Sequence, residues 1–160
     1  MFSETTKWPT NLMSLQLVVI IGCSVLSNCG SLPPRPSTQC REFYDININQ
    51  RDAKIRSSSA EIAVDLYICG MHQEPPTDFA GIIAERGTEV IPILLEDMNT
   101  TNDEGRQDLV LHIFERLAEK GELRGNHKAV EELRQIVGRM KIEQIKLVSQ
   151  KRLVTIEGKV

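Results

Sequence analysis

Apolar residues recur at helical spacing through most of the chain beyond residue 57. Between residues 58 and 153 they stand three or four positions apart, which is the spacing of one face of an α-helix. Ser58 and Glu61 have the spacing of a capping box, and the apolar positions that follow predict a first helix from about Ser59 to His72. A pair of prolines then ends this helix. The pattern therefore predicts an all-α domain over residues 58–153.

Capping residues and glycines divide the rest of this pattern into further helices. Asp78 and Thr88 are suited to begin helices, and Gly87 and Gly121 are suited to end them. Pro92 falls in the first turn of the third helix, where a missing backbone amide costs little. Five or six helices are therefore expected, arranged as antiparallel pairs. They are predicted over residues 78–87, 88–98, 109–121 and 126–140, with a further helical stretch over 142–153.

Two segments flank the predicted helical domain. Residues 30–57 are rich in proline and polar residues, and their one alternating stretch, Asp45–Asn49, has no evident partner strand, so a flexible linker is expected. At the other end, Ser149 and Arg152 are polar where the apolar stripe would continue. The last helix is therefore expected to end before a tail of residues 154–160.

The composition argues against a nucleic-acid partner. The 160 residues carry a formal net charge of −3, with a pI near 5.7, so the chain has no general attraction to polyanions. Aromatic residues make up only 4% of the chain, which leaves few platforms for stacking on bases. Tyr67, Phe79 and Phe114 fall at apolar helical positions, and we expect them in the core.

The beginning of the chain has the pattern of an export signal. Lys7 precedes an apolar run from Leu12 to Leu26, which is shorter than the ~20 residues that span a bilayer. Two cysteines lie near its end, Cys23 after a glycine and Cys29 after Leu-Ser-Asn. This end resembles the cleavage site of a bacterial lipoprotein signal. The resemblance implies a signal peptide over residues 1–29 and a lipid on the cysteine.

The number of cysteines favours Cys29 over Cys23 as the lipidated residue. If Cys29 is modified, Cys40 and Cys69 remain as a pair, whereas modification of Cys23 would leave an unpaired third thiol. In an oxidising compartment the pair is expected to form a disulfide worth about 3 to 4 kcal/mol. Two alternatives stay open. Cleavage after Ser27 would release a soluble periplasmic or secreted protein, and an uncleaved signal would remain as an anchor.

A short sequence recurs at the ends of two predicted helices. Ile83-Ala84-Glu85-Arg86-Gly87 matches Leu117-Ala118-Glu119-Lys120-Gly121, which lies 34 residues further along. Two-helix repeats of about this length are typical of α-solenoids. Residues 77–140, with Pro92 early in the second helix of the unit, resemble a HEAT-like repeat, which implies a surface that binds or scaffolds other proteins. The alternative is an irregular helical bundle, because alanine, glutamate, a basic residue and glycine commonly end helices.

We find no catalytic or metal site at a recognised spacing. Cys69 and His72 are spaced as two zinc ligands, but no second pair follows. Residues 97–108 resemble a calcium-binding loop, but Asn102 replaces the turn glycine and Asp108 replaces the bidentate glutamate. The sequence therefore predicts no catalytic residue, no metal ligand and no cofactor, and we expect a protein without enzymatic activity.

The C-terminal helical stretch is mildly basic. Its cations are expected on the solvated side of an amphipathic helix, and they are Lys141, Lys146, Lys151 and Arg152. The alternative is weak contact with an anionic membrane surface or an acidic partner. Taken with the signal, the sequence predicts a membrane-anchored lipoprotein of the bacterial envelope. It would face the periplasm and bind another envelope protein through its helical domain. The alternative is a small periplasmic inhibitor or immunity protein that blocks a secreted enzyme.

Overall fold

The structure is a computed structural model that describes residues 38–70 and 78–160, and these residues form helices joined by turns and loops, with no strand among them. The all-α prediction is confirmed. The helix count differs, because the described residues form eight α-helices and one 3-10 turn instead of five or six helices. The elements are α2 (Thr38–Asp45), α3 (Ile48–Ser57), α4 (Ala60–Gly70), α5 (Phe79–Ala84), η1 (Gly87–Val90), α6 (Ile91–Thr100), α7 (Glu104–Glu119), α8 (His127–Arg139) and α9 (Glu143–Glu157).

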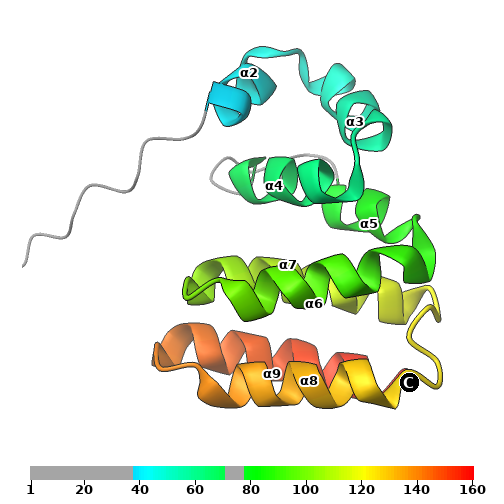
Figure 1. The fold of residues 1–160 in the computed structure, drawn as a ribbon, viewed down its shortest axis with the longest axis vertical. Coiled ribbons are helices and arrows are strands. Elements are labelled where there is room, and N and C mark those ends of the chain that lie inside the picture. The colour runs from blue at the N-terminus through cyan, green and yellow to red at the C-terminus, as the bar shows by residue number, and fades with distance from the viewer. Residues whose placement is uncertain (1–37, 71–77) are drawn as a thin grey trace, which may run out of the picture. The chain divides into compact units, whose positions relative to one another are not determined.

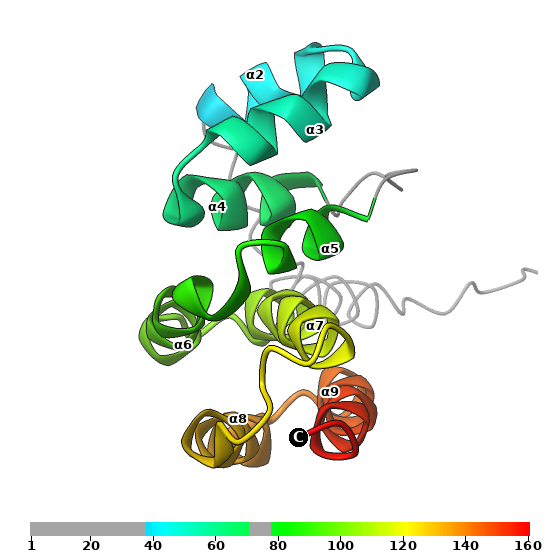
Figure 2. The same ribbon diagram turned by 90° about the vertical axis from the view of Figure 1, so that its right-hand side faces the viewer.

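α4 packs against α5, α6 against α7 and α8 against α9, and the helices stack into two layers. One layer consists of α2, α4, α6 and α8, and the other of α3, α5, α7 and α9 (Figures 1 and 2). Within the second layer each helix contacts the next, α3 on α5, α5 on α7 and α7 on α9. All described residues belong to one compact unit, and among them α9 is the last helix of the second layer.

Two helices occupy part of the segment that was predicted to be a flexible linker. Within residues 30–57, α2 buries Phe43, which is 2% exposed, and α3 buries Ile55 completely. The linker prediction is wrong here because isolated buried residues such as Phe43 and Ile55 leave no periodic stripe to detect. Asn47 contributes a local signal, since its side chain caps α3 by accepting a hydrogen bond from the Asn49 amide.

The first predicted helix begins close to its expected start. It corresponds to α4, which starts at Ala60, and the Ser59 hydroxyl accepts a hydrogen bond from the Ile62 amide at 3.4 Å. Ser58 instead closes α3, because its amide donates to the terminal carbonyls of that helix. The predicted end of the helix falls in residues 71–77, which lie outside the described residues.

The connection from α5 to α6 differs from the prediction by one turn. Asp78 caps α5 as expected, accepting a hydrogen bond from the Gly81 amide at 3.0 Å. Gly87 has a φ of 68°, which favours glycine, but it begins η1 instead of directly preceding an α-helix. The α-helix predicted from Thr88 therefore starts at Ile91, with Pro92 in its first turn.

The last helix is longer than the sequence indicates. α9 continues to Glu157, so most of the predicted tail, residues 154–160, is helical. Leu153 and Ile156 are buried, and Ser149 is completely buried with them although it is polar. The prediction ended the helix early because a buried serine interrupts the apolar stripe.

Apolar side chains between the two layers form one continuous core. The three aromatic residues expected there are buried, with exposed fractions of 1% for Tyr67, 2% for Phe79 and 0% for Phe114. At about 25 cal/mol per Å² of buried apolar surface, such residues supply most of the stabilisation that holds the pairs together. Their completely buried neighbours include Ile83, Val90, Leu94, Met98, Val110, Leu111, Ile113, Leu117, Leu123 and Leu133.

No helix in the described part of the chain combines the length and apolar content that crossing a membrane requires.

Candidate functional site

The two candidate lipidation residues, Cys29 and Cys23, lie outside the described residues, as does His72. The structure joins Cys40 of α2 to Cys69 of α4 in a disulfide, with Cα atoms 5.6 Å apart. The bond fastens the first described helix to the rest of the stack, in which α2 also contacts α4. Beside it, the ring of Phe43 meets the ring of Phe79 edge-on, with centroids 5.9 Å apart.

The protein itself engages the carboxylates of the calcium-like segment. Asp97 accepts hydrogen bonds from Arg106 Nε at 3.0 and 3.1 Å, and Asp103 caps α7 by accepting from two backbone amides. Asp108 accepts a hydrogen bond from Ser149 of α9. These side chains therefore organise helix ends and junctions. Over residues 38–70 and 78–160 no group of three or more His, Cys, Asp or Glu residues is placed to hold a metal ion.

The four basic residues of the C-terminal stretch have different roles. Lys146 donates to the carbonyl oxygens of Gly138 at 3.1 Å and Met140 at 3.2 Å, and so caps the end of α8. Arg152 points into the junction with α7. Lys141 and Lys151 are exposed. The prediction of a solvated basic face therefore holds for Lys141 and Lys151. It does not hold for Lys146 and Arg152, whose side chains make contacts within the structure.

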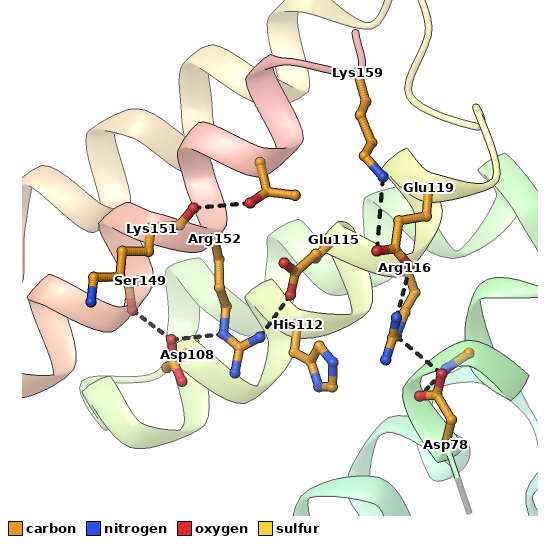
Figure 3. A network of polar contacts seen from close by, with 12 residues as sticks. Asp78, Asp108, His112, Glu115, Arg116, Glu119, Ser149, Lys151, Arg152 and Lys159 are labelled. Carbon is orange, nitrogen blue, oxygen red and sulfur yellow. Dashed lines mark hydrogen bonds and ion pairs between the residues drawn. The ribbon is translucent and has the colours of Figure 1, made fainter.

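Figure 3 shows the polar junction between α7 and α9. Asp108 accepts a 2.8 Å hydrogen bond from the Ser149 hydroxyl, and it also lies 3.4 Å from Arg152 Nε. Arg152 Nη1 donates to Glu115 at 2.7 Å. Both carboxylates are largely buried, with side-chain exposures of 16% and 19%. Two carboxylates of α7 therefore bind the guanidinium group of Arg152 and the hydroxyl group of Ser149 from α9.

The same layer contains arginine–carboxylate ion pairs at its other junctions. Arg56 of α3 pairs with Glu85, which directly follows α5, and Arg116 Nε of α7 lies 3.0 Å from Asp78 Oδ2 at the start of α5. The Arg56 guanidinium lowers the pKa of the Glu85 carboxyl, mainly through the hydrogen bond between them. Because these pairs are partly exposed and screened by water, their main effect is on how the neighbouring helices align.

His112 and Tyr67 form a polar contact between α7 and α4. The Tyr67 hydroxyl lies 2.9 Å from His112 Nδ1, and the neutral imidazole accepts this proton when its own hydrogen is on Nε2. Burial lowers the pKa of His112, and the positive charges of Arg152 and Arg116 lower it further. Burial likewise raises the pKa of Tyr67. The histidine is therefore held neutral at pH 7 and acts as a structural acceptor.

Two open depressions in the described surface are lined mainly by charged and polar residues. One, of about 360 Å³, lies between α3, α5 and α7. Arg56, Glu85, Arg116 and Glu119 line it, and they satisfy one another as ion pairs. A second, of about 370 Å³, lies between α6 and α8. Neither is an apolar pocket of the type that encloses a small molecule.

The outward face of α9 carries exposed apolar side chains. Leu147 is 52% exposed and Val154 is 68% exposed, and they stand two turns apart on one side of the helix. Val148 is 43% exposed beside them, and Ile142 is 52% exposed at the start of the helix. Lys151 lies beside the line from Leu147 to Val154, between that line and Val148. We call Leu147, Val148, Lys151 and Val154 the α9 outer face.

The α9 outer face corresponds to the side of α7 that receives α9. Asp108 and Glu115, which bind α9, are the fifth and twelfth residues of α7, and Leu147 and Val154 are the fifth and twelfth of α9. The corresponding sides of the two helices therefore carry carboxylates in α7 and apolar side chains in α9. Each helix also buries its seventh, eleventh and fourteenth residues, which are Val110, Phe114 and Leu117 in α7 and Ser149, Leu153 and Ile156 in α9.

The two copies of the recurring sequence occupy equivalent places. Ile83 and Leu117 are both completely buried at the ends of α5 and α7. The glycine that ends each copy has a positive φ, 68° at Gly87 and 78° at Gly121. The recurrence thus marks equivalent helix ends in two successive pairs of the stack.

Two arginines that organise the stack were missed by the sequence analysis. Arg106 reaches from α7 to Asp65 of α4 at 2.7 Å and to Asp97 of α6. Arg86 donates to the carbonyl oxygens of Ile55 at 2.9 Å and Ser58 at 2.7 Å, which closes the end of α3. No local pattern distinguishes these arginines from solvated ones, because their partners are distant in the sequence.

The comparisons with known proteins assign the chain to no family. No protein-family model matches it, and neither a curated protein nor a solved structure is significantly similar to it.

Proposed function

We propose that the chain is an exported, lipid-anchored protein of the bacterial cell envelope, and that its helical domain binds another protein and catalyses no reaction. The observation that carries the binding role is the α9 outer face. Leu147 and Val154 are exposed at the positions that α7 uses to receive the next helix. Grouped apolar side chains at the open end of a helix stack are typical of a protein contact surface.

The envelope address is supported by the N-terminal sequence. The apolar run before Cys29 resembles a lipoprotein signal, and lipidation there would anchor the domain in the membrane and leave it facing the periplasm. The pairing of Cys40 with Cys69 suits an oxidising compartment, where such bonds persist.

The anchoring part is tested by fractionation of cells that produce the full chain. We expect the parent in the membrane fraction and Cys29→Ser in the soluble envelope fraction, because the thioether-linked lipid is lost. Cys23→Ser is the matched control and should fractionate as the parent does. Membrane recovery of Cys29→Ser would contradict lipidation at Cys29. Mass spectrometry of the mature N-terminus identifies the modified residue directly.

The binding part is tested by cross-linking in intact cells, followed by purification of the full chain. We expect one stoichiometric envelope protein to be recovered at several cross-linker lengths. Recovery of a secreted hydrolase with loss of its activity would instead support the inhibitor or immunity alternative. Recovery of the chain alone at every cross-linker length would contradict both binding roles.

A further inference from the structure

We propose that the α9 outer face binds an amphipathic helix of another protein, with apolar side chains in the contact and a carboxylate opposite Lys151, so that the partner helix continues the stack. This inference rests on the proposed function and specifies its contact surface.

The layer itself defines where the partner helix lies. In the second layer α3, α5, α7 and α9 each contact the next helix, and α9 has no following helix in the described part of the chain. The side of α9 that bears Leu147 and Val154 is the side on which α7 bears Asp108 and Glu115, the residues that contact α9. A helix placed on α9 as α9 lies on α7 therefore covers both apolar side chains.

The chemistry of the contact follows from the residues at these positions. On α7 the receiving positions are carboxylates, and α9 supplies Arg152 and Ser149 to them. On α9 the receiving positions are Leu147 and Val154, which gain from contact with apolar groups. Lys151, beside them, has no ion pair within the described residues. The complementary helix thus has an apolar stripe with an acidic residue along one side.

A second copy of the chain does not supply that residue. In antiparallel pairing of two α9 helices through Leu147 and Val154, the two copies of Lys151 fall on the same side near the twofold axis. In parallel pairing Lys151 faces the uncharged Gln150. The two carboxylates of α9 do not remedy this, because Glu157 already pairs with Arg134 and Glu143 lies about two helical turns before Lys151. The charges therefore favour a different, acidic partner.

The test uses the full chain in zwitterionic lipid nanodiscs and a labelled, stapled peptide of about four helical turns. The peptide carries leucines on one face and a glutamate at the edge of that face, and a second peptide has lysine in place of the glutamate. Binding is followed by fluorescence anisotropy. We expect the acidic peptide to bind at micromolar concentration and the basic peptide to bind several-fold more weakly.

Variants of the chain assign the binding to the α9 outer face. Leu147→Asp and Val154→Asp are each expected to weaken binding about tenfold, because each buries a charge against leucine. Lys151→Glu should reverse the preference between the two peptides. The matched control is Ile62→Asp, which alters an exposed apolar residue of α4 and should leave binding unchanged. Circular dichroism checks that each variant is folded. If one aspartate variant does not fold, the other still tests the α9 outer face.

Other outcomes would overturn the inference. Equal binding of both peptides, or binding unchanged in both aspartate variants, contradicts a specific acidic helix site. If the chain self-associates and Leu147→Asp abolishes this self-association, the face binds a second copy of the chain. If the chain instead prefers anionic vesicles to the peptide, and Leu147→Asp abolishes the binding to vesicles, the face binds a membrane surface. The peptide assay requires neither lipidation nor the natural partner. Its failure therefore leaves the cross-linking and fractionation tests of the proposed function unaffected.

Discussion

The hydroxyl group of Ser149 donates a hydrogen bond to Asp108 Oδ1 over 2.8 Å, joining the completely buried side of α9 to α7. The serine occupies a position at which an apolar residue would be expected. It is tolerated there because a buried hydroxyl with a partner avoids the penalty of an unsatisfied polar group. Arg152 approaches the same carboxylate from the next turn, so Asp108 organises two residues of α9.

Loss of Asp108 should cost more than loss of its serine partner. We expect Asp108→Ala to lower the free energy of unfolding by about 2 to 3 kcal/mol, because it leaves the buried Ser149 hydroxyl unsatisfied and removes one of the anions beside Arg152. Ser149→Ala should cost about 1 kcal/mol, since Asp108 keeps the arginine. Urea denaturation measures both. Gln150→Ala, an exposed change on the same helix, is the control, and equal effects of the first two variants would contradict the prediction.

Reduction of the disulfide should destabilise the described helices. Cys40 and Cys69 are 29 residues apart, and closing a loop of that size constrains the unfolded chain by about 3 to 4 kcal/mol. A reducing agent is therefore expected to lower the urea midpoint of the parent. Without reductant, the double variant Cys40→Ser with Cys69→Ser should already unfold at a lower urea midpoint than the parent. Addition of the reductant should not change its midpoint. An equal response in both proteins would show that other thiols cause the effect.

Two glycines should respond to alanine in opposite directions. Gly121 has a φ of 78°, a conformation that costs an L-residue about 1 kcal/mol, so Gly121→Ala should lower the melting temperature. Gly138 lies within α8, and no atom lies within 4 Å of a Cβ built there. Gly138→Ala should therefore raise stability by about 0.5 to 1 kcal/mol through higher helix propensity. A loss of stability in Gly138→Ala would contradict the open position seen in the structure.

His112 should make stability fall as the solution is acidified below neutral pH. Its pKa is lowered in the folded state by burial and by two arginines, so the unfolded chain takes up a proton first. The stabilising contribution is complete above the unfolded pKa of about 6.5, and it is lost as the pH falls through the folded value. Unfolding at pH 7.5 and 5.5 should show this loss in the parent and a smaller loss in His112→Gln.

The control for the histidine prediction is His127→Gln, which changes the first residue of α8 and should keep the pH response of the parent. Titration of the His112 ring by NMR gives the folded pKa directly. A folded pKa at or above 6.5 would contradict the proposed effect of burial and of Arg152 and Arg116.

The helices that were predicted well are those whose information is local. Asp78 and Asn126 cap helices within three residues of themselves, and the apolar stripes of α7 and α8 are regular. The element between Gly87 and Ile91 was misplaced because a 3-10 turn and the first turn of an α-helix have almost the same sequence preferences.

The elements that were missed depend on distant contacts. α2 buries Phe43 and α3 buries Ile55, and the two helices are held by the Cys40–Cys69 bond and by Arg86, which closes α3 from beyond α5. The end of α9 was missed because Ser149 resembles a solvent position until Asp108 is placed beside it. The apolar side of α9 was likewise obscured, since Leu147 and Val154 stand opposite its buried residues.

By itself the sequence determined an all-α chain, the approximate places of most helices, the buried aromatic residues and the cysteine pair open to disulfide formation. Each of these follows from spacing, capping or composition, which act over a few residues or over the chain as a whole. Only the tertiary structure decided that the helices form two layers, that Arg152 and Lys146 are structural cations, and that Leu147 and Val154 remain uncovered. Those properties depend on which helix lies against which, and pairing between distant segments leaves no periodic trace in the sequence.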